Sequence, residues 1–194
     1  MHKHGVNRCT IIIGVILVLV AVASIQYKSI IKRFYPLKYK SYIIKYTAEY
    51  ELDPYLISAI IKVESSYNPR AESKKSAKGL MQITPSTGKW VAEKLNITEF
   101  NDEMLYDPEQ NIRIGCWYIN NLIEEFGSPK DENNLVLILA AYNGGRGNVN
   151  KWLNDKGHSK TGKYLDDIPF KETKNYIKKV KYDYKIYKWL YPKF

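Results

Sequence analysis

A single carboxylate lies among aliphatic residues in the segment IIKVESSYNPR, which runs from Ile60 to Arg70. Most glutamates face water and are ionised at neutral pH. A carboxyl group held against aliphatic side chains is disfavoured in its charged form, so its pKa rises. Such a group keeps its proton near neutral pH and can donate it to a reacting atom, which is general acid catalysis. Glu64 is therefore the first candidate catalytic residue.

The helix that must position Glu64 begins at Pro54, because Asp53 is a good N-cap and proline is favoured at the first helical position. Four residues follow at i, i+3, i+4 and i+7, which places them in one stripe of one face: Ile57, Ile60, Ile61 and Glu64. This stripe predicts that Glu64 ends a buried row. The alternative is that Glu64 turns into solvent at the end of the helix, or caps a neighbour through Ser65 and Ser66.

Apolar residues recur at helical spacing along most of the chain, and Gly, Pro and Asn separate the segments. Besides the helix that begins at Pro54, we expect helices in six segments: Tyr42–Tyr50, Ser86–Leu95, Pro108–Phe126, Glu132–Tyr142, Val149–Leu153 and Glu172–Leu190. The pattern predicts an all-α or mainly α domain over residues 42–194.

The N-terminal region reads as a targeting or membrane segment. Sixteen residues without a charge, TIIIGVILVLVAVASI, run from Thr10 to Ile25 and follow Lys3 and Arg8. We expect residues 1–26 to be a signal-anchor, with 27–41 as a basic juxtamembrane stalk and the domain outside the membrane, facing the cell wall. A removable signal peptide is the alternative, because AVAS resembles a cleavage site and the segment is shorter than a typical spanning helix. Secretion would then follow. The stronger positive charge lies on the C-terminal flank, which favours the reverse orientation.

Charge and cysteine content exclude few partners. The net charge is +10, and residues 1–45 hold eight Lys or Arg and no acid. This suits an anionic membrane or wall polymer, and solvated lysine faces explain it equally well. Nucleic acid is not expected, since no basic-aromatic motif accompanies the charge. The two cysteines form no metal-ligand spacing, so the sequence predicts neither a metal nor another cofactor. It carries no signal of oligomeric state.

Five motifs occur in order along the domain: ESSYNP at 64–69, GLMQITPST at 79–87, DPEQNIRIGCWYI at 107–119, AYNGG at 141–145 and ETKNY at 172–176. Together they resemble the soluble lytic transglycosylase family, whose goose-type-lysozyme-like domains cut peptidoglycan. The resemblance covers about residues 45–190. It implies a lysozyme-like helical fold and glycan strands as substrate.

The resemblance also implies roles for single residues. Glu64 matches the family's catalytic acid. Gln82, Tyr142 and Asn143 match positions that line the saccharide groove, Ser73 matches a hydroxyl near the scissile sugar, and Glu172 matches a second acid along the groove. Packing alone is the alternative for Tyr142.

The implied reaction cleaves the MurNAc–GlcNAc β-1,4 bond without water and leaves a 1,6-anhydro-MurNAc end. One acid suffices, because it first donates a proton and then takes one from the C6 hydroxyl. Two alternatives stay open: a hydrolytic muramidase on the same fold, and a catalytically idle module that binds the wall. The chain departs from the family at Ser76, where glycine is usual, and at Thr84 and Arg146, where many relatives have Met and Pro.

Other patterns indicate packing. Met81 and Leu80 are expected in the core, as are Trp117, Tyr118 and Trp152 at helical positions. The last predicted helix places its apolar residues on one face and lysines on the other. That lysine face either follows an anionic wall polymer or membrane, or is simply solvated.

Overall fold

The computed structural model describes residues 8–194, which divide into two compact units at Pro36 and Leu37. The first unit contains one helix, α1 (Arg8–Phe34), whose described aliphatic side chains from Ile11 to Val22 are exposed. In the part of the chain that the structure describes, no helix combines the length and the apolar character that crossing a membrane requires. The first seven residues of the predicted segment 1–26 lie outside the described part.

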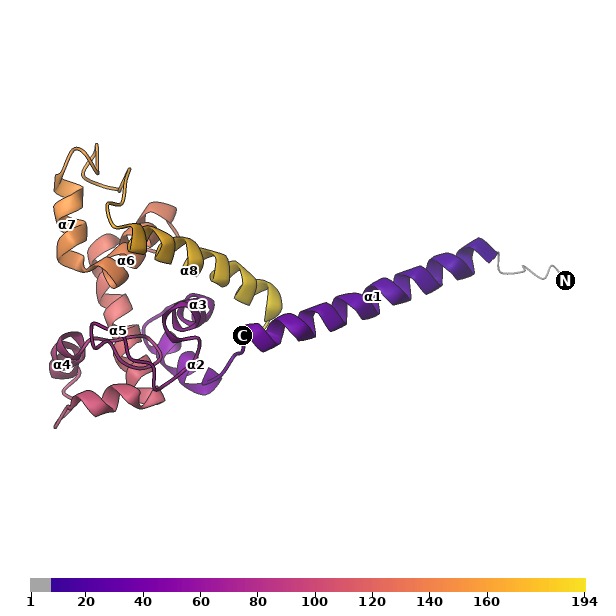
Figure 1. Cartoon of the computed structure of the whole chain (residues 1–194), viewed down its shortest axis with the longest axis horizontal. Coiled ribbons are helices and arrows are strands. Elements are labelled where there is room, and N and C mark those ends of the chain that lie inside the picture. Colours follow the sequence, from indigo (N-terminus) through magenta and orange to yellow (C-terminus); the bar gives the residue numbers. More distant parts are fainter. Residues whose placement is uncertain (1–7) are drawn as a thin grey trace. The chain divides into compact units, whose positions relative to one another are not determined.

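The second unit, residues 37–194, is built from helices, and the prediction of a mainly helical domain is confirmed (Figure 1). Its elements are α2 (Lys40–Glu49), α3 (Pro54–Ser65), α4 (Pro85–Lys94), a 3-10 helix (Asp102–Tyr106), α5 (Pro108–Phe126), α6 (Glu132–Gly144), α7 (Arg146–Asn154) and α8 (Lys171–Leu190). Among the described residues the only β-type pairing consists of isolated bridges, Glu72 with Lys78 and Lys78 with Ile83.

Local signals set most helix ends. The Asp53 carboxylate accepts a hydrogen bond from Tyr55 N at 2.9 Å, so the predicted cap of α3 is confirmed. The predicted bounds of α5 match the structure, and its first turn is capped by Asp107. The segment predicted as Val149–Leu153 is longer than expected. Gly145, with a φ of +91°, separates α6 from α7, so that α7 starts directly after it.

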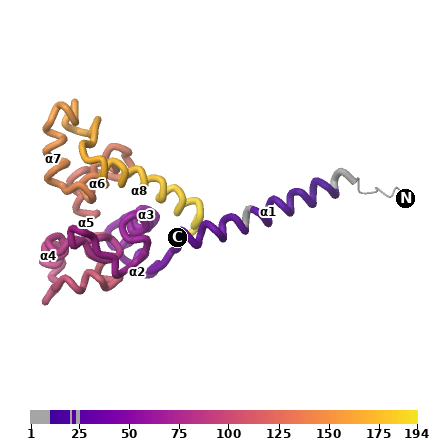
Figure 2. Tube along the Cα trace, in the orientation of Figure 1, coloured from indigo at the N-terminus to yellow at the C-terminus, as the bar shows by residue number. Residues whose placement is uncertain are grey.

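The core lies between α3, α5 and α6 and the helices that pack on them. Helix α5 contacts α2, α4, α6 and the 3-10 helix, while α8 packs along α3 and α6. Figures 1 and 2 show α3 beside α8, although these helices come from opposite ends of the domain's sequence. The side chains of Ile57, Ile60 and Ile61 are fully buried. The aliphatic stripe therefore faces the core, as its spacing predicted.

Of the three aromatic residues expected in the core, only one is buried in the structure. Trp152 is buried, but Trp117 and Tyr118 are only half-buried, so that part of the expectation is wrong. The reason is that both rings pack on Trp90, with centroids 5.2 and 6.2 Å away, in a half-exposed cluster rather than inside the helix bundle. Met81 and Leu80 are fully buried, as predicted.

Candidate active site

The six residues singled out in the sequence line one pocket of about 370 Å³. They come from four segments: the end of α3, the loop between α3 and α4, the end of α6 and the start of α8. They are Glu64, Ser73, Gln82, Tyr142, Asn143 and Glu172. Lys74, Lys75, Ala77 and Thr84 complete the lining. A neighbouring pocket of about 290 Å³ shares Gln82, Thr84, Tyr142 and Asn143, so the two form a continuous groove.

The end of α3 fixes Glu64. Ser66 and Tyr67 have φ values of 51° and 64°, in the left-handed region, which turns the chain sharply away after the helix. The Ser65 hydroxyl donates to Leu80 O at 2.8 Å and so ties the helix end to the following loop. The Ser65 side chain therefore braces the backbone beside Glu64.

The GLMQ loop is held by one buried amide. Asn111, on α5, accepts a hydrogen bond from Met81 N at 2.7 Å through Oδ1. Its Nδ2 donates to Lys78 O at 2.9 Å and to Leu105 O at 2.7 Å. One turn further along α5, Gly115 leaves room for Met81, because a Cβ there would lie 2.3 Å from Met81 Sδ. This explains why asparagine and glycine occupy these positions of the DPEQNIRIGCWYI segment.

Two of the predicted groove residues also support the loop. Gln82 adopts a φ of 48°, and its Nε2 donates to Ala71 O at 3.1 Å and Gly79 O at 3.0 Å. The Tyr142 hydroxyl donates to Met81 O at 2.7 Å. Its proton is thus committed to the protein, and the side chain is fixed where it lines the pocket.

Asn143 and Ser73 accept hydrogen bonds from groups outside the GLMQ loop. Asn143 Oδ1 accepts a hydrogen bond from the Thr173 hydroxyl at 2.8 Å, which links α6 to α8 beside the pocket. The exposed Ser73 hydroxyl accepts from Ala77 N at 3.1 Å and keeps its own proton available to a ligand. Ser76 has a φ of 57°, the left-handed conformation that glycine adopts freely. The serine thus takes the backbone shape that the usual glycine would take.

Burial raises the pKa of Glu64 from 4.5 to about 7. Two groups from α8 modify this shift: a hydrogen-bond interaction with Tyr176 lowers the pKa, and the charge of Glu172 raises it. Glu64 is partly open to the pocket. A carboxyl group with this pKa exists in both protonation states near neutral pH, so it can give a proton and later take one back.

Tyr176 was not singled out from the sequence as a site residue. It is buried, and its hydroxyl makes no hydrogen bond of normal length to any described residue. Burial, followed by the Glu64 charge, raises the pKa of its phenol well above 10. The spacing within ETKNY offered a signal, because Tyr176 follows Glu172 by four residues and so shares its helix face.

The raised pKa of Glu64 makes the stability of the fold depend on pH. The folded protein retains a proton that the unfolded chain releases between pH 4.5 and about 7, so the free energy of unfolding falls as pH rises through this window. We expect Glu64→Gln to be more stable than the wild type above pH 7, by about 3 kcal/mol, and equal to it near pH 4. Chemical denaturation at both pH values measures the difference.

The matched control is Glu172→Gln, which changes an exposed carboxylate of the same pocket. Its stability difference from the wild type should vary much less with pH. An equal gain for Glu64→Gln at both pH values would mean that the stabilisation comes from packing and not from charge.

Comparisons with known proteins agree with this geometry. A family model described as a transglycosylase SLT domain matches residues 41–165. The soluble lytic murein transglycosylase of Escherichia coli K12 is 36% identical over 148 residues, which are 75% of this chain and 22% of that protein.

Solved structures are similar over the same region. The 70 kDa soluble lytic transglycosylase of E. coli gives a TM-score of 0.69 at 32% identity, over 81% of this chain and 25% of that one. An inactive Glu-to-Gln mutant of the Pseudomonas aeruginosa lytic transglycosylase gives 0.68 at 32% identity, over 80% and 24%. This chain thus spans about a quarter or less of the length of these proteins. The family model and the similar fold together establish that the chain belongs to the transglycosylase SLT domain family.

Proposed function

We propose that this chain is a peptidoglycan lytic transglycosylase that cleaves the β-1,4 bond between N-acetylmuramic acid and N-acetylglucosamine. The observation that carries the proposal is the position of Glu64, with a pKa of about 7, in a pocket that also contains Ser73, Gln82, Tyr142 and Asn143. The names of the similar proteins, which include murein transglycosylases, support the choice of substrate.

The proposed reaction uses Glu64 twice. Protonated Glu64 donates to the glycosidic oxygen as the bond from C1 to that oxygen breaks. The acetamido group of the substrate stabilises the cationic centre. Glu64, now a carboxylate, takes the proton of the C6 hydroxyl while that oxygen bonds to C1, which closes the 1,6-anhydro ring. No water is consumed, and the enzyme returns to its starting protonation state.

Tyr176 and Glu172 act on this cycle through the pKa of Glu64. The Tyr176 interaction favours the carboxylate that forms after proton donation, and the charge of Glu172 favours the protonated form that begins the cycle. Burial is the largest cause of the raised pKa of Glu64, and these two opposing effects modify it.

A hydrolytic muramidase is the second candidate, because Glu172 lines the same pocket as Glu64. Glycoside hydrolases commonly pair an acid with a second carboxylate that activates water or attacks the sugar. Mass spectrometry of digested peptidoglycan separates the two reactions, since anhydro ends are one water lighter than reducing ends. Anhydro ends are expected. Reducing ends alone would replace the proposal with hydrolysis, and wall binding without any product would leave an idle binding module.

The proposal places the domain outside the membrane, facing the wall, with residues 1–26 as its anchor and 27–41 as a stalk. The membrane anchor is supported by the exposed aliphatic side chains of α1 from Ile11 to Val22, whereas the basic residues that follow them favour the reverse orientation. We expect the full chain to sediment with membranes and to resist extraction by high salt. Recovery of a shortened chain in the medium would instead identify a cleaved signal peptide.

A further inference from the structure

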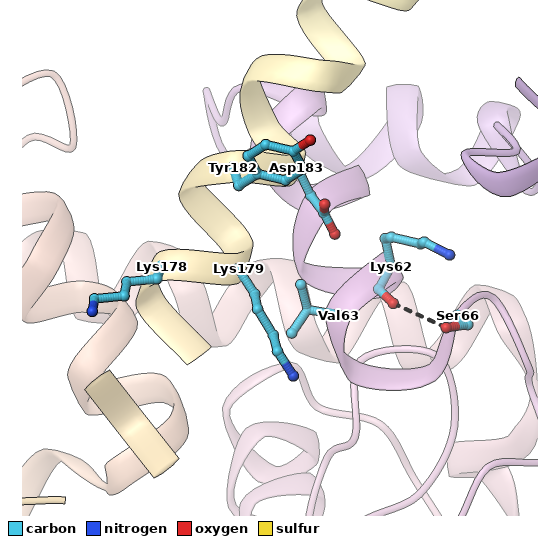
Figure 3. Close-up of a pocket in the computed structure, with 7 residues that line it drawn as sticks. All are labelled: Lys62, Val63, Ser66, Lys178, Lys179, Tyr182 and Asp183. Atoms are coloured by element: carbon cyan, nitrogen blue, oxygen red, sulfur yellow. Dashed lines mark hydrogen bonds between the residues drawn. The ribbon is translucent and has the colours of Figure 1, made fainter. Parts of the chain in front are cut away.

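A second pocket, of about 460 Å³, lies between α3 and α8 (Figure 3). We call it the α3–α8 pocket. It is lined by Lys62, Val63, Ser66, Lys178, Lys179, Tyr182 and Asp183. Three of these seven residues are lysines, and the acid among them, Asp183, is buried. The lining therefore carries more positive than negative charge.

The α3–α8 pocket is separate from the active site, although both use α3 and α8. The two pockets have no lining residue in common. Lys62 lies two residues before Glu64, which is about 200° around the helix, and Ser66 follows the end of α3, where the chain turns away. A ligand in the α3–α8 pocket would thus leave the catalytic pocket open to its own substrate.

The lysines of α8 differ in whether an acidic group neutralises them. Lys181 forms an ion pair with Glu132, and Lys188 bonds to Tyr184 and lies 4.0 Å from Asp53. Lys178 and Lys179 form no ion pair with any described residue, and both are exposed. Lys171 and Lys185 of α8 likewise form no ion pair with a described residue, but of these four lysines only Lys178 and Lys179 line the α3–α8 pocket.

The arrangement of the groups indicates the class of ligand. In Figure 3 the ammonium groups of Lys62, Lys178 and Lys179 do not converge on one point. Such a spread suits several anionic groups along a polymer better than one small anion. The ring of Tyr182 is 62% exposed and offers an apolar face for a sugar ring, and the exposed Ser66 offers a hydroxyl.

We propose that the α3–α8 pocket binds an anionic polysaccharide, a glycan that carries phosphate or carboxylate groups at intervals along its chain. Lys178 and Lys179 contact the anionic groups through charge-assisted hydrogen bonds, and Tyr182 packs on a sugar between them. The site retains the domain on its polymer surface and does not enter the bond-cleaving step. It is independent of the chemistry proposed for Glu64.

The test compares two double variants of the full chain that remove the same charge: K178Q/K179Q, within the pocket, and K181Q/K188Q, outside it. Phosphorylated dextran is the probe, and unmodified dextran of equal length is the neutral control. We expect K178Q/K179Q to weaken binding of phosphorylated dextran by about tenfold or more at low salt, with a shallower salt dependence. K181Q/K188Q should change it by less than about threefold, and neutral dextran should bind all forms weakly.

Tyr182→Ala tests the sugar contact. It should weaken binding of phosphorylated dextran severalfold and leave binding of inorganic polyphosphate unchanged. Cleavage of a soluble glycan substrate should be unaffected by all these variants, which separates failure here from failure of the catalytic proposal. Circular dichroism checks that each variant is folded.

Three results would overturn the proposal. Equal losses for both double variants would mean that net charge alone attracts the polymer. Unchanged binding by K178Q/K179Q would exclude the pocket. If K178Q/K179Q lost binding only to phosphatidylglycerol vesicles and still bound the polysaccharide, the two lysines would be assigned to a lipid surface.

Discussion

Replacing Glu64 by glutamine is expected to lower the rate of glycan cleavage by about a thousandfold, which is within the range for loss of a general acid. Glutamine keeps the size and shape of the side chain but has no proton to donate to the glycosidic oxygen. The helix end that carries it is fixed independently, through the hydrogen bond from Ser65 to Leu80 O. The initial rate of peptidoglycan solubilisation, together with the yield of anhydro products, measures the effect.

Glu172→Gln is the matched control, because it makes the same chemical change in the same pocket. It should keep activity within about tenfold of the wild type. It should also lower the pKa of Glu64, since the charge of Glu172 raises that pKa. An equal loss of rate in both variants would instead point to a reaction that needs two carboxylates, as in hydrolytic glycosidases.

Asn111→Ala should lower the free energy of unfolding by about 3 kcal/mol or more, because it removes three hydrogen bonds at once, two of them buried and one partly buried. The side chain is fully buried and joins α5 to the backbone of Lys78, Met81 and Leu105. Alanine would leave the partner groups without hydrogen bonds and would open a cavity beside them. Denaturant unfolding of the purified chain measures the change.

Asn133→Ala is the control for this substitution. Asn133 is exposed in the first turn of α6, so its loss should change stability by less than about 0.5 kcal/mol. A small effect at Asn111 would mean that the GLMQ loop is held mainly by the packing of Met81 and by Tyr142, whose hydroxyl bonds to Met81 O.

The sequence by itself determined the helices and the buried face of the one that carries Glu64. Helix signals are local: the cap at Asp53, the proline after it and the spacing of three isoleucines all lie within one short segment. The ordered motifs also identified the family, and the six residues named from them line one pocket. The raised pKa followed from the same aliphatic stripe, because burial is its largest cause.

Only the tertiary structure decided which partners those residues meet. It placed Tyr176 and Glu172 beside Glu64, used Asn111 to hold a loop far from it in sequence, and neutralised Lys181 but not Lys178. Helical periodicity tells which face of a helix points inward, but the neighbour on that face depends on how distant segments pack. The two effects that modify the pKa of Glu64 after burial come from Tyr176 and Glu172 of α8, and local patterns along the chain do not encode that contact.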